Sequence, residues 1–306
     1  MLIKRVSSPF TVRGLLGAVC AMGLFSCDIQ TQEILPSSLG DIEDSVNEIA
    51  KKEEVKMEYR EASCDAIYDA MVKAYGKPMK GPIPVYVAGV LLEVADATRT
   101  IMEVDGGDQN RFRAAILDTD DPVCFGIPDG RILLGRGLLE SVVKNEAQLA
   151  AILAHECAHI AAEHVWKRLD KAFEETFWLQ MGSELLSGGK LSERNIRKAR
   201  ETALKEVGLD SRGRKPLEFA YERREERQAL EVAQDVLESL GYNVLDVVAM
   251  ASTLRAVEAA DAERKPVHNL SGQLLSRLED RKFTPGRSGR EPYEESVLAR
   301  LGEQQR

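Results

Sequence analysis

The residues of this chain that can do chemistry are concentrated in the pentapeptide His155-Glu156-Cys157-Ala158-His159. In an α-helix, positions four apart lie one turn apart on the same face, so both imidazoles can bind one zinc ion. Glu156 lies about 100° around such a helix and can reach a water molecule on that ion. Zinc lowers the pKa of its water towards neutrality, and a carboxylate can take the proton while the water attacks a carbonyl. The spacing is therefore typical of a hydrolytic zinc site.

The sequence around the pentapeptide predicts the helix that this site requires. Asn145 suits the N-cap position, and Gln148 three residues later completes a variant of the capping box. The run from 146 to 154 has strong helix propensity, and apolar residues recur at helical spacing. Three of the four histidines of the chain fall within ten residues. The alternative, a core helix with incidental histidines, is disfavoured in so histidine-poor a chain.

A catalytic zinc ion needs a third protein ligand beside the two histidines. His164 follows His155 by nine residues, which is about 180° around a continuous helix. We therefore expect His164 to be structural or to contact a ligand rather than to bind zinc. The acidic cluster from 222 to 228 lies on a separate predicted helix, so one of its glutamates can approach the metal from another side. The alternative for this cluster is a solvated charged face.

The composition is that of a globular protein and limits the classes of function. The chain has 306 residues, of which 44% are hydrophobic and 30% are charged, and its formal net charge is -9. This length allows one substantial domain with additions, or two small domains. The acidic balance argues against nucleic acid as the main partner.

The N-terminus has the order of a secretory signal. Basic residues up to Arg13 precede an apolar run from 14 to 26 that is too short for a comfortable membrane span. The end of this run, Leu24-Phe25-Ser26-Cys27, resembles a bacterial lipobox, so Cys27 is expected to become the lipidated first residue. A lipid-modified terminus anchors a protein without spanning the membrane. We therefore predict a lipoprotein on the periplasmic face of the bacterial cell envelope; an uncleaved signal anchor is the alternative.

Four segments follow from these features. We expect a signal segment over 1–27, an acidic tether over 28–62, a zinc peptidase domain over 63–265 and a looser C-terminal tail over 266–306.

The expected fold class is α+β: a mainly helical, zincin-like domain with a small β-sheet beside the active-site helix. Strand-like patterns cover residues 85–87, 90–94, 101–104, 113–117, 123–127 and 131–134. Besides the helix that begins after Asn145, helical patterns cover residues 63–75, with Ser63 as a possible N-cap, 217–240 and 244–262. Cys64 and Cys124 could pair in an oxidising compartment.

The run from Asn145 to His159, closing with Ala162-Glu163-His164, resembles the HtpX-like and Oma-type zinc metallopeptidases, the family that also includes the CAAX prenyl proteases. The upstream turn Asp129-Gly130-Arg131-Ile132 is similar to the family's approach to this helix. The resemblance covers roughly residues 83 to 262.

The same resemblance implies the third zinc ligand. The family pattern E-x-E-A-D, followed by a helix and a Gly-Tyr pair, corresponds here to Glu226-Arg227-Gln228-Ala229-Leu230 and Gly241-Tyr242. Counting back from Gly241-Tyr242 implies that the ligand is Glu226. Glu222 is the weaker candidate, because registering the motif on it would put Glu226 in the Asp position.

The chain departs from the family pattern at two positions. Gln228 replaces the second Glu, and Leu230 stands where the family has an Asp that supports the zinc site. A loss of such support lowers affinity or activity rather than changing the fold. His268-Asn269 is similar to a His-Pro segment late in the family, and we assign it no role.

The resemblance implies a zinc metalloendopeptidase that hydrolyses polypeptides, with one zinc ion per chain held by His155, His159 and Glu226. Glu156 would act as general base and later as proton donor. The implied substrates are misfolded or misassembled envelope proteins. The alternative, which Leu230 favours, is a non-catalytic lipoprotein of the same fold that acts as an envelope chaperone or binding module. The sequence leaves the oligomeric state open.

Overall fold

A computed structural model describes residues 39–104, 112–173, 192–212, 217–260, 267–268, 270–280 and 286–304 of the chain. The predicted signal segment, with Cys27, lies outside the described residues. The chain divides into two compact units, Met1–Asn47 and Glu48–Arg306. The first contributes only the beginning of one helix to the description, and everything below concerns the second. Within the described part, no helix combines the length and the apolar composition that a membrane span requires.

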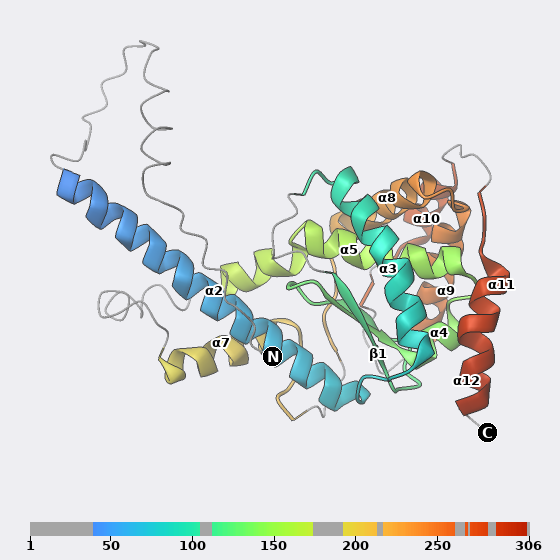
Figure 1. Ribbon diagram of the computed structural model, residues 1–306, viewed down its shortest axis with the longest axis horizontal. Helices are drawn as coiled ribbons and strands as arrows, with labels where there is room; N and C mark the ends of the chain where they lie inside the picture. The colour runs from blue at the N-terminus through green and yellow to red at the C-terminus, as the bar shows by residue number, and fades with distance from the viewer. Residues whose placement is uncertain are drawn as a thin grey trace, which may run out of the picture. The chain divides into compact units, whose positions relative to one another are not determined.

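The fold is mainly helical with one small sheet, which confirms the predicted α+β class (Figure 1). The helices with described bounds are α2 (Leu39–Tyr75), α3 (Pro82–Ile101), α4 (Arg136–Ser141), α5 (Glu146–Ala161), α7 (Glu193–Glu206), α8 (Arg223–Ser239), α9 (Leu245–Ala260), α10 (Gly272–Glu279), α11 (Arg290–Tyr293), the π-helical turn η3 (Glu294–Leu298) and α12 (Ala299–Gln304). Residues 164–173 are also helical. The strands are β1 (Arg113–Leu117), β2 (Cys124–Gly126) and β3 (Arg131–Gly135).

The three strands form a mixed sheet in the order β1-β3-β2. β2 and β3 lie within the segments predicted as strands at 123–127 and 131–134 and form an antiparallel hairpin, whose turn contains Gly130 with φ 95°. β1 runs parallel to β3, with Arg113 opposite Arg131 and Leu117 opposite Gly135. β2 therefore lies at one edge of the sheet, next to the helix that carries the histidine motif.

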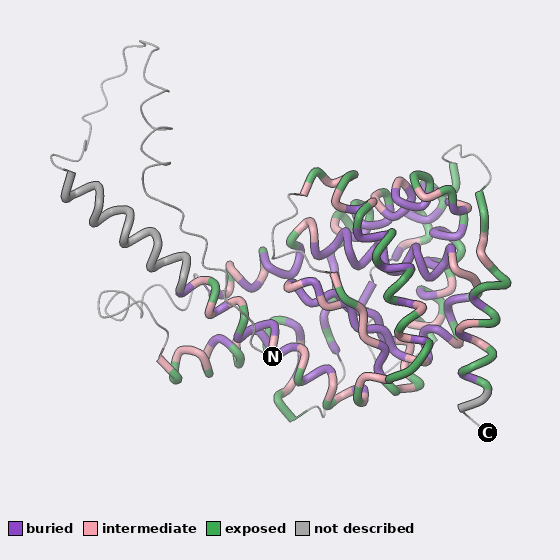
Figure 2. The backbone as a smooth tube through the Cα atoms, viewed as in Figure 1, coloured by how far each residue is buried: buried purple, intermediate pink, exposed green. Residues whose placement is uncertain are grey.

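The sheet separates two hydrophobic cores because successive residues of a strand point to opposite faces. On β3, Ile132 and Leu134 pack into the core with α3, α5, α8 and α9, whereas Leu133 packs into the core with α2 and α7. On β2, Cys124 and Phe125 divide in the same way. Figure 2 shows α5, β2 and β3 as almost wholly buried, whereas β1 is buried only at Ile116 and Leu117.

The strands predicted at 85–87, 90–94 and 101–104 are wrong, because α3 occupies most of this region. The β-branched residues there favour strands as single residues. Their spacing is helical, however, since Ile83, Val87, Val90 and Val94 are buried on one face while Val85 is 72% exposed.

Three further boundaries differ from the prediction. The first helix begins at Leu39 rather than Ser63, so Ser63 is a buried residue inside α2 and part of the predicted tether is helical. The helix predicted from 217 begins at Arg223. Cys64 and Cys124 are both buried and free, and they lie in different cores on opposite sides of the sheet.

The C-terminal segment was expected to be loose, and its described part packs into the core. Tyr293, Val297 and Leu301 are buried, and the Tyr293 hydroxyl donates to the Leu139 carbonyl at 2.8 Å. The carbonyl of Ser288 accepts a hydrogen bond from the Ala147 N–H at 2.9 Å. Residues near the C-terminus therefore accept hydrogen bonds from backbone N–H groups in the first turn of α5, which have no acceptor within the helix.

Candidate metal centre

The start of α5 is fixed by side chains from two helices. The Asn145 side chain accepts a hydrogen bond from the Gln148 N–H at 2.8 Å, which confirms the predicted N-cap. The Gln148 side chain accepts from the Lys144 N–H at 2.9 Å. Asp246 of α9 accepts from the amides of both Asn145 (2.9 Å) and Gln148 (3.2 Å). These bonds set the position of α5 along its own axis, and with it the position of both histidines.

Small side chains let another helix come close to α5. Every residue from Ala147 to Ile160 is buried, and alanine occupies positions 150, 151, 154 and 158. Alanine has a short side chain, so the neighbouring helix can pack close to the backbone of α5. α8 packs against α5 in the same core, which brings Glu226 to the histidine motif.

The side chains of His155, His159 and Glu226 converge on one point. His155 Nε2 lies 3.1 Å from His159 Nε2, and Glu226 Oε2 lies 3.3 Å from the first and 4.0 Å from the second. Ligands of a tetrahedral zinc ion, at about 2.0–2.2 Å from the metal, are about 3.3–3.6 Å apart. The three residues are at most 3% exposed. Their atom types, spacing and burial therefore fit a metal ion.

The electrostatics of the centre also suit a cation. Burial, reinforced by the neighbouring imidazoles of His155 and His164, holds the pKa of His159 well below its usual value. His159 is therefore neutral at neutral pH, which is the state that binds a metal.

The two acidic candidates are placed differently. Glu226 is fully buried beside the imidazoles. Glu222 is exposed and is the N-cap of α8, where its side chain and that of Glu225 form a reciprocal capping box. Of these two residues, only Glu226 is brought to the histidines. Leu230, one turn further along α8, is buried in the core that α5 and α8 share.

His164 lies against His159 rather than at the point where the three ligand atoms meet. Its Nδ1 atom is 2.8 Å from His159 Nδ1, and its Nε2 atom is 3.3 Å from Gln228 Oε1. The expectation that His164 faces away assumed a continuous helix. α5 in fact ends at Ala161, Glu163 takes a left-handed conformation with φ 56°, and a new helical segment begins at His164, so the phase of α5 does not continue to His164. His164 can therefore orient the ring of His159.

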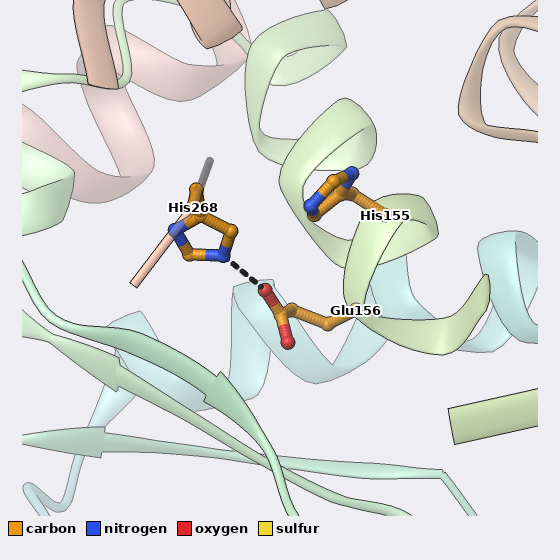
Figure 3. Close-up of side chains that lie close together, drawn as sticks. All are labelled: His155, Glu156 and His268. Carbon is orange, nitrogen blue, oxygen red and sulfur yellow. Dashed lines mark hydrogen bonds and ion pairs between the residues drawn. The ribbon is translucent and has the colours of Figure 1, made fainter. Parts of the chain in front are cut away.

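Glu156 is held on one carboxylate oxygen, as Figure 3 shows. Its Oε1 atom accepts hydrogen bonds from His268 Nε2 at 3.1 Å and from the Cys124 thiol at 3.3 Å. Its Oε2 atom is buried and has no hydrogen-bond partner among the described residues. Burial, the largest single influence, would raise the pKa of Glu156, but the hydrogen bond and charge of His268, the charge of His155 and the hydrogen bond from Cys124 together outweigh it, so the pKa lies below its usual value. Glu156 is therefore a charged carboxylate with one unengaged oxygen.

His268, to which we assigned no role from the sequence, also belongs to this site. Its Nδ1 atom lies 3.1 Å from Glu258 of α9, and its Nε2 atom contacts Glu156. Burial opposes its protonation, but the two carboxylates hold its pKa well above the usual value. Two features of the sequence could have pointed to His268: histidine is rare in this chain, and its segment is similar to a His-Pro segment of the family.

A second set of potential ligand atoms, from His155, Glu156 and His268, also lies within 4.8 Å. A doubly protonated imidazole has no lone pair for a metal. The ion pair of His268 with Glu156 therefore favours the set that contains His159 and Glu226.

Aromatic side chains pack against the centre. The ring of Tyr221 stacks on His159, with ring centres 3.6 Å apart, and it also packs against Phe125 and Phe219. The Tyr221 N–H donates to the Val267 carbonyl at 3.1 Å, which joins the segment before α8 to the segment of His268. This arrangement separates the centre from bulk water, because its residues are also buried: His155, Glu156, His159, Glu226 and His268.

Comparison with known proteins agrees with this arrangement. Residues 94–275, more than half of the chain, match the model of peptidase family M48. The chain belongs to this family of metallopeptidases, which confirms the resemblance to Oma-type and HtpX-like enzymes.

A stretch of 114 residues is 28% identical to a protein of Schizosaccharomyces pombe named mitochondrial metalloendopeptidase OMA1. The match covers 36% of this chain and 32% of that protein, so the chain spans about a third of the length of this relative.

Proposed function

We propose that this protein is a zinc-dependent endopeptidase that hydrolyses polypeptides. The observation that carries the proposal is the convergence of His155 Nε2, His159 Nε2 and Glu226 Oε2, with the carboxylate of Glu156 beside them. The name of the OMA1 relative, a metalloendopeptidase, supports cleavage within polypeptide chains. The alternative of a non-catalytic lipoprotein rests on Leu230 alone, and the complete set of ligand and base residues weighs against it.

In this proposal each residue has a separate role. His155, His159 and Glu226 hold the zinc ion, which when bound supplies a Lewis acid that polarises a peptide carbonyl and lowers the pKa of a water molecule. Glu156 accepts the proton of the attacking water on Oε2 and later delivers it to the leaving amine. His268 holds Oε1, so that Oε2 is the oxygen presented to the proton. Tyr221 keeps the ring of His159 in place by stacking.

The substitution Glu156→Gln tests this function directly. The amide is nearly isosteric with the carboxylate and Glu156 is not a proposed ligand, so one zinc ion per chain should remain. Loss of the base should lower the rate of cleavage of casein or an unfolded envelope protein by about 10²–10⁴-fold. Zinc is measured by mass spectrometry of the metal, and cleavage by gel and peptide release over long incubations.

The matched control is Glu201→Gln, which changes an exposed glutamate of α7 and should leave both quantities unchanged. If wild type and Glu156→Gln both bind zinc and neither cleaves any unfolded substrate, the non-catalytic alternative replaces the peptidase. If wild type binds no zinc, the proposed centre is wrong.

The proposal extends to the location of the protein. The order of basic residues, apolar run and Leu24-Phe25-Ser26-Cys27 supports a lipoprotein of the bacterial envelope whose substrates are misfolded envelope proteins. Mass spectrometry of the N-terminal peptide of membrane-extracted protein should find diacylglycerol on Cys27. An unmodified terminus at Met1 would show that the chain is not processed in this way.

A further inference from the structure

A pocket lined by arginines lies between the N-terminal turns of α8 and α10, outside the metal centre. Its volume is about 210 Å³. Its polar lining consists of Arg223, Arg224, Arg227, Arg277, Ser271 and Gln273. We call it the arginine pocket. A fifth arginine is close, since a terminal nitrogen of Arg255 on α9 lies 3.4 Å from the position of a β-carbon built on Gly272.

These arginines have few carboxylate partners. Arg227 has one glutamate, Glu231, at 4.0 Å. In the described part of the chain, Arg223, Arg224 and Arg277 form no ion pair within 4.0 Å. The whole chain has a net charge of -9, so an excess of acidic residues was available to pair with them. The cluster of positive charge is therefore a local property of this pocket.

The arginines of the cluster repel one another and the N-terminus of α8, and the acidic residues of the same turn, Glu222 and Glu225, offset only part of this repulsion. The N-terminus of a helix carries a partial positive charge, and cations there are destabilising. Arg223 and Arg224 lie in the first turn of α8, where this effect is greatest. Arg227 follows them at spacings of four and three, at which like charges on a helix repel. A bound anion would relieve all of these repulsions at once.

We propose that the arginine pocket binds a phosphate group. The planar guanidinium group donates paired hydrogen bonds that match phosphate oxygens, and several such groups around one pocket suit an anion with more than one charge. A phosphate monoester carries about -1.5 to -2 charges and three strong acceptor oxygens, whereas a carboxylate carries one charge and two oxygens. The volume is that of a site for one such group rather than for a folded partner.

The ligand would connect two parts of the molecule that are separate in sequence. Its contacts would come from α8, which carries Glu226, and from α10, which follows the segment of His268. Because a ligand that binds only the folded state stabilises it, phosphate should raise the melting temperature. This proposal does not rest on the peptidase activity.

The test is calorimetric titration of the full-length protein with inorganic phosphate, at ionic strength held constant with sodium chloride. The variant Arg224→Gln/Arg277→Gln, which removes one guanidinium from each helix, should bind phosphate at least tenfold more weakly. Arg300→Gln, at an exposed arginine of α12, is the control and should bind as wild type does. In the absence of phosphate, the double variant should melt no lower than wild type, because it has lost repulsion rather than ion pairs.

A second titration uses glycerophosphoglycerol, a soluble phosphodiester with the headgroup structure of an anionic lipid. Tight binding of inorganic phosphate alone identifies a free phosphate or monoester as the ligand. Tighter binding of the diester identifies a lipid headgroup. If neither titration responds to Arg224→Gln/Arg277→Gln, or if a poly-glutamate peptide binds the pocket and phosphate does not, the proposal is wrong.

Discussion

Glu156 has two chemically distinct oxygens. Oε1 is engaged by a protonated imidazole and a thiol, while Oε2 faces Gly126, where a β-carbon would lie 3.0 Å from it. Because Gly126 of β2 has no side chain, the space beside Oε2 of Glu156, the proposed base, is not filled. The strand that borders the site shapes it by the absence of a side chain.

At the residue scale we predict a graded loss of zinc among three substitutions. Glu226→Ala removes a proposed ligand and should have the largest effect. His164→Ala removes a contact to the ring of His159, a type of change that lowers metal affinity about 10–100-fold. Glu222→Ala removes an exposed N-cap and should leave the zinc affinity unchanged. Competition with a fluorescent zinc chelator measures all three.

An opposite order, in which His164→Ala strips the metal and Glu226→Ala does not, would reassign the third ligand.

Single residues of the site were predictable only where they share one helix. His155, Glu156 and His159 follow from spacing on α5, and Glu226 follows from resemblance to a family. The orientation of His164 depends on where α5 ends. Because α5 ends before Glu163, which has a positive φ, His164 contacts His159 instead of facing away from it. His268 reaches Glu156 across 112 positions of sequence, and local patterns carry no information about such a contact.

Among the elements, α5 has an N-cap residue, Asn145, that also donates a hydrogen bond to the buried Asp246 of α9. We predict that Asn145→Ala lowers the free energy of unfolding by up to about 2 kcal/mol, the upper end for loss of an N-cap. The reason is that the buried carboxylate of Asp246 loses one of its two amide donors as well. Urea denaturation measures the change.

Ser192→Ala, at the N-cap of α7, is the comparison, because its side chain accepts from the Asn195 N–H at the start of a more exposed helix. Equal losses for the two substitutions would show that Asp246 contributes nothing.

The elements were predictable where residue type and spacing agree. In β2, β3 and α9, the residue types and their spacing indicate the same kind of element. In α3 they conflict, because β-branched residues favour strands while the buried positions recur every three to four residues. In the N-terminal half of α2 many residues are charged, which favoured the interpretation as a tether, although Leu39, Ile42, Val46 and Ile49 recur at helical spacing.

At the scale of the whole molecule, the C-terminal residues belong to the folded domain. A chain that ends at residue 285 would lose Tyr293, Val297 and Leu301 from the core and the acceptors of the first N–H groups of α5. We predict that it does not fold cooperatively, because burial of a single large apolar side chain already contributes about 1.5–3 kcal/mol. Circular dichroism during heating distinguishes this outcome.

Arg300→Gln, in the same segment but exposed, should unfold at the same temperature as wild type. If the truncated chain melts at the same temperature as wild type, the C-terminal segment does not contribute to the stability of the domain and the prediction is wrong.

The hydrogen bond from the Tyr221 N–H to the Val267 carbonyl offers a way to measure how often the buried centre opens. In the proposed function, zinc, water and a polypeptide have to reach buried atoms, and this bond joins two of the segments around those atoms. The rate at which the Tyr221 amide exchanges its proton for deuterium therefore reports how often they part. Chelators should not remove zinc by this route faster than that amide opens, and turnover by the same route should obey the same limit.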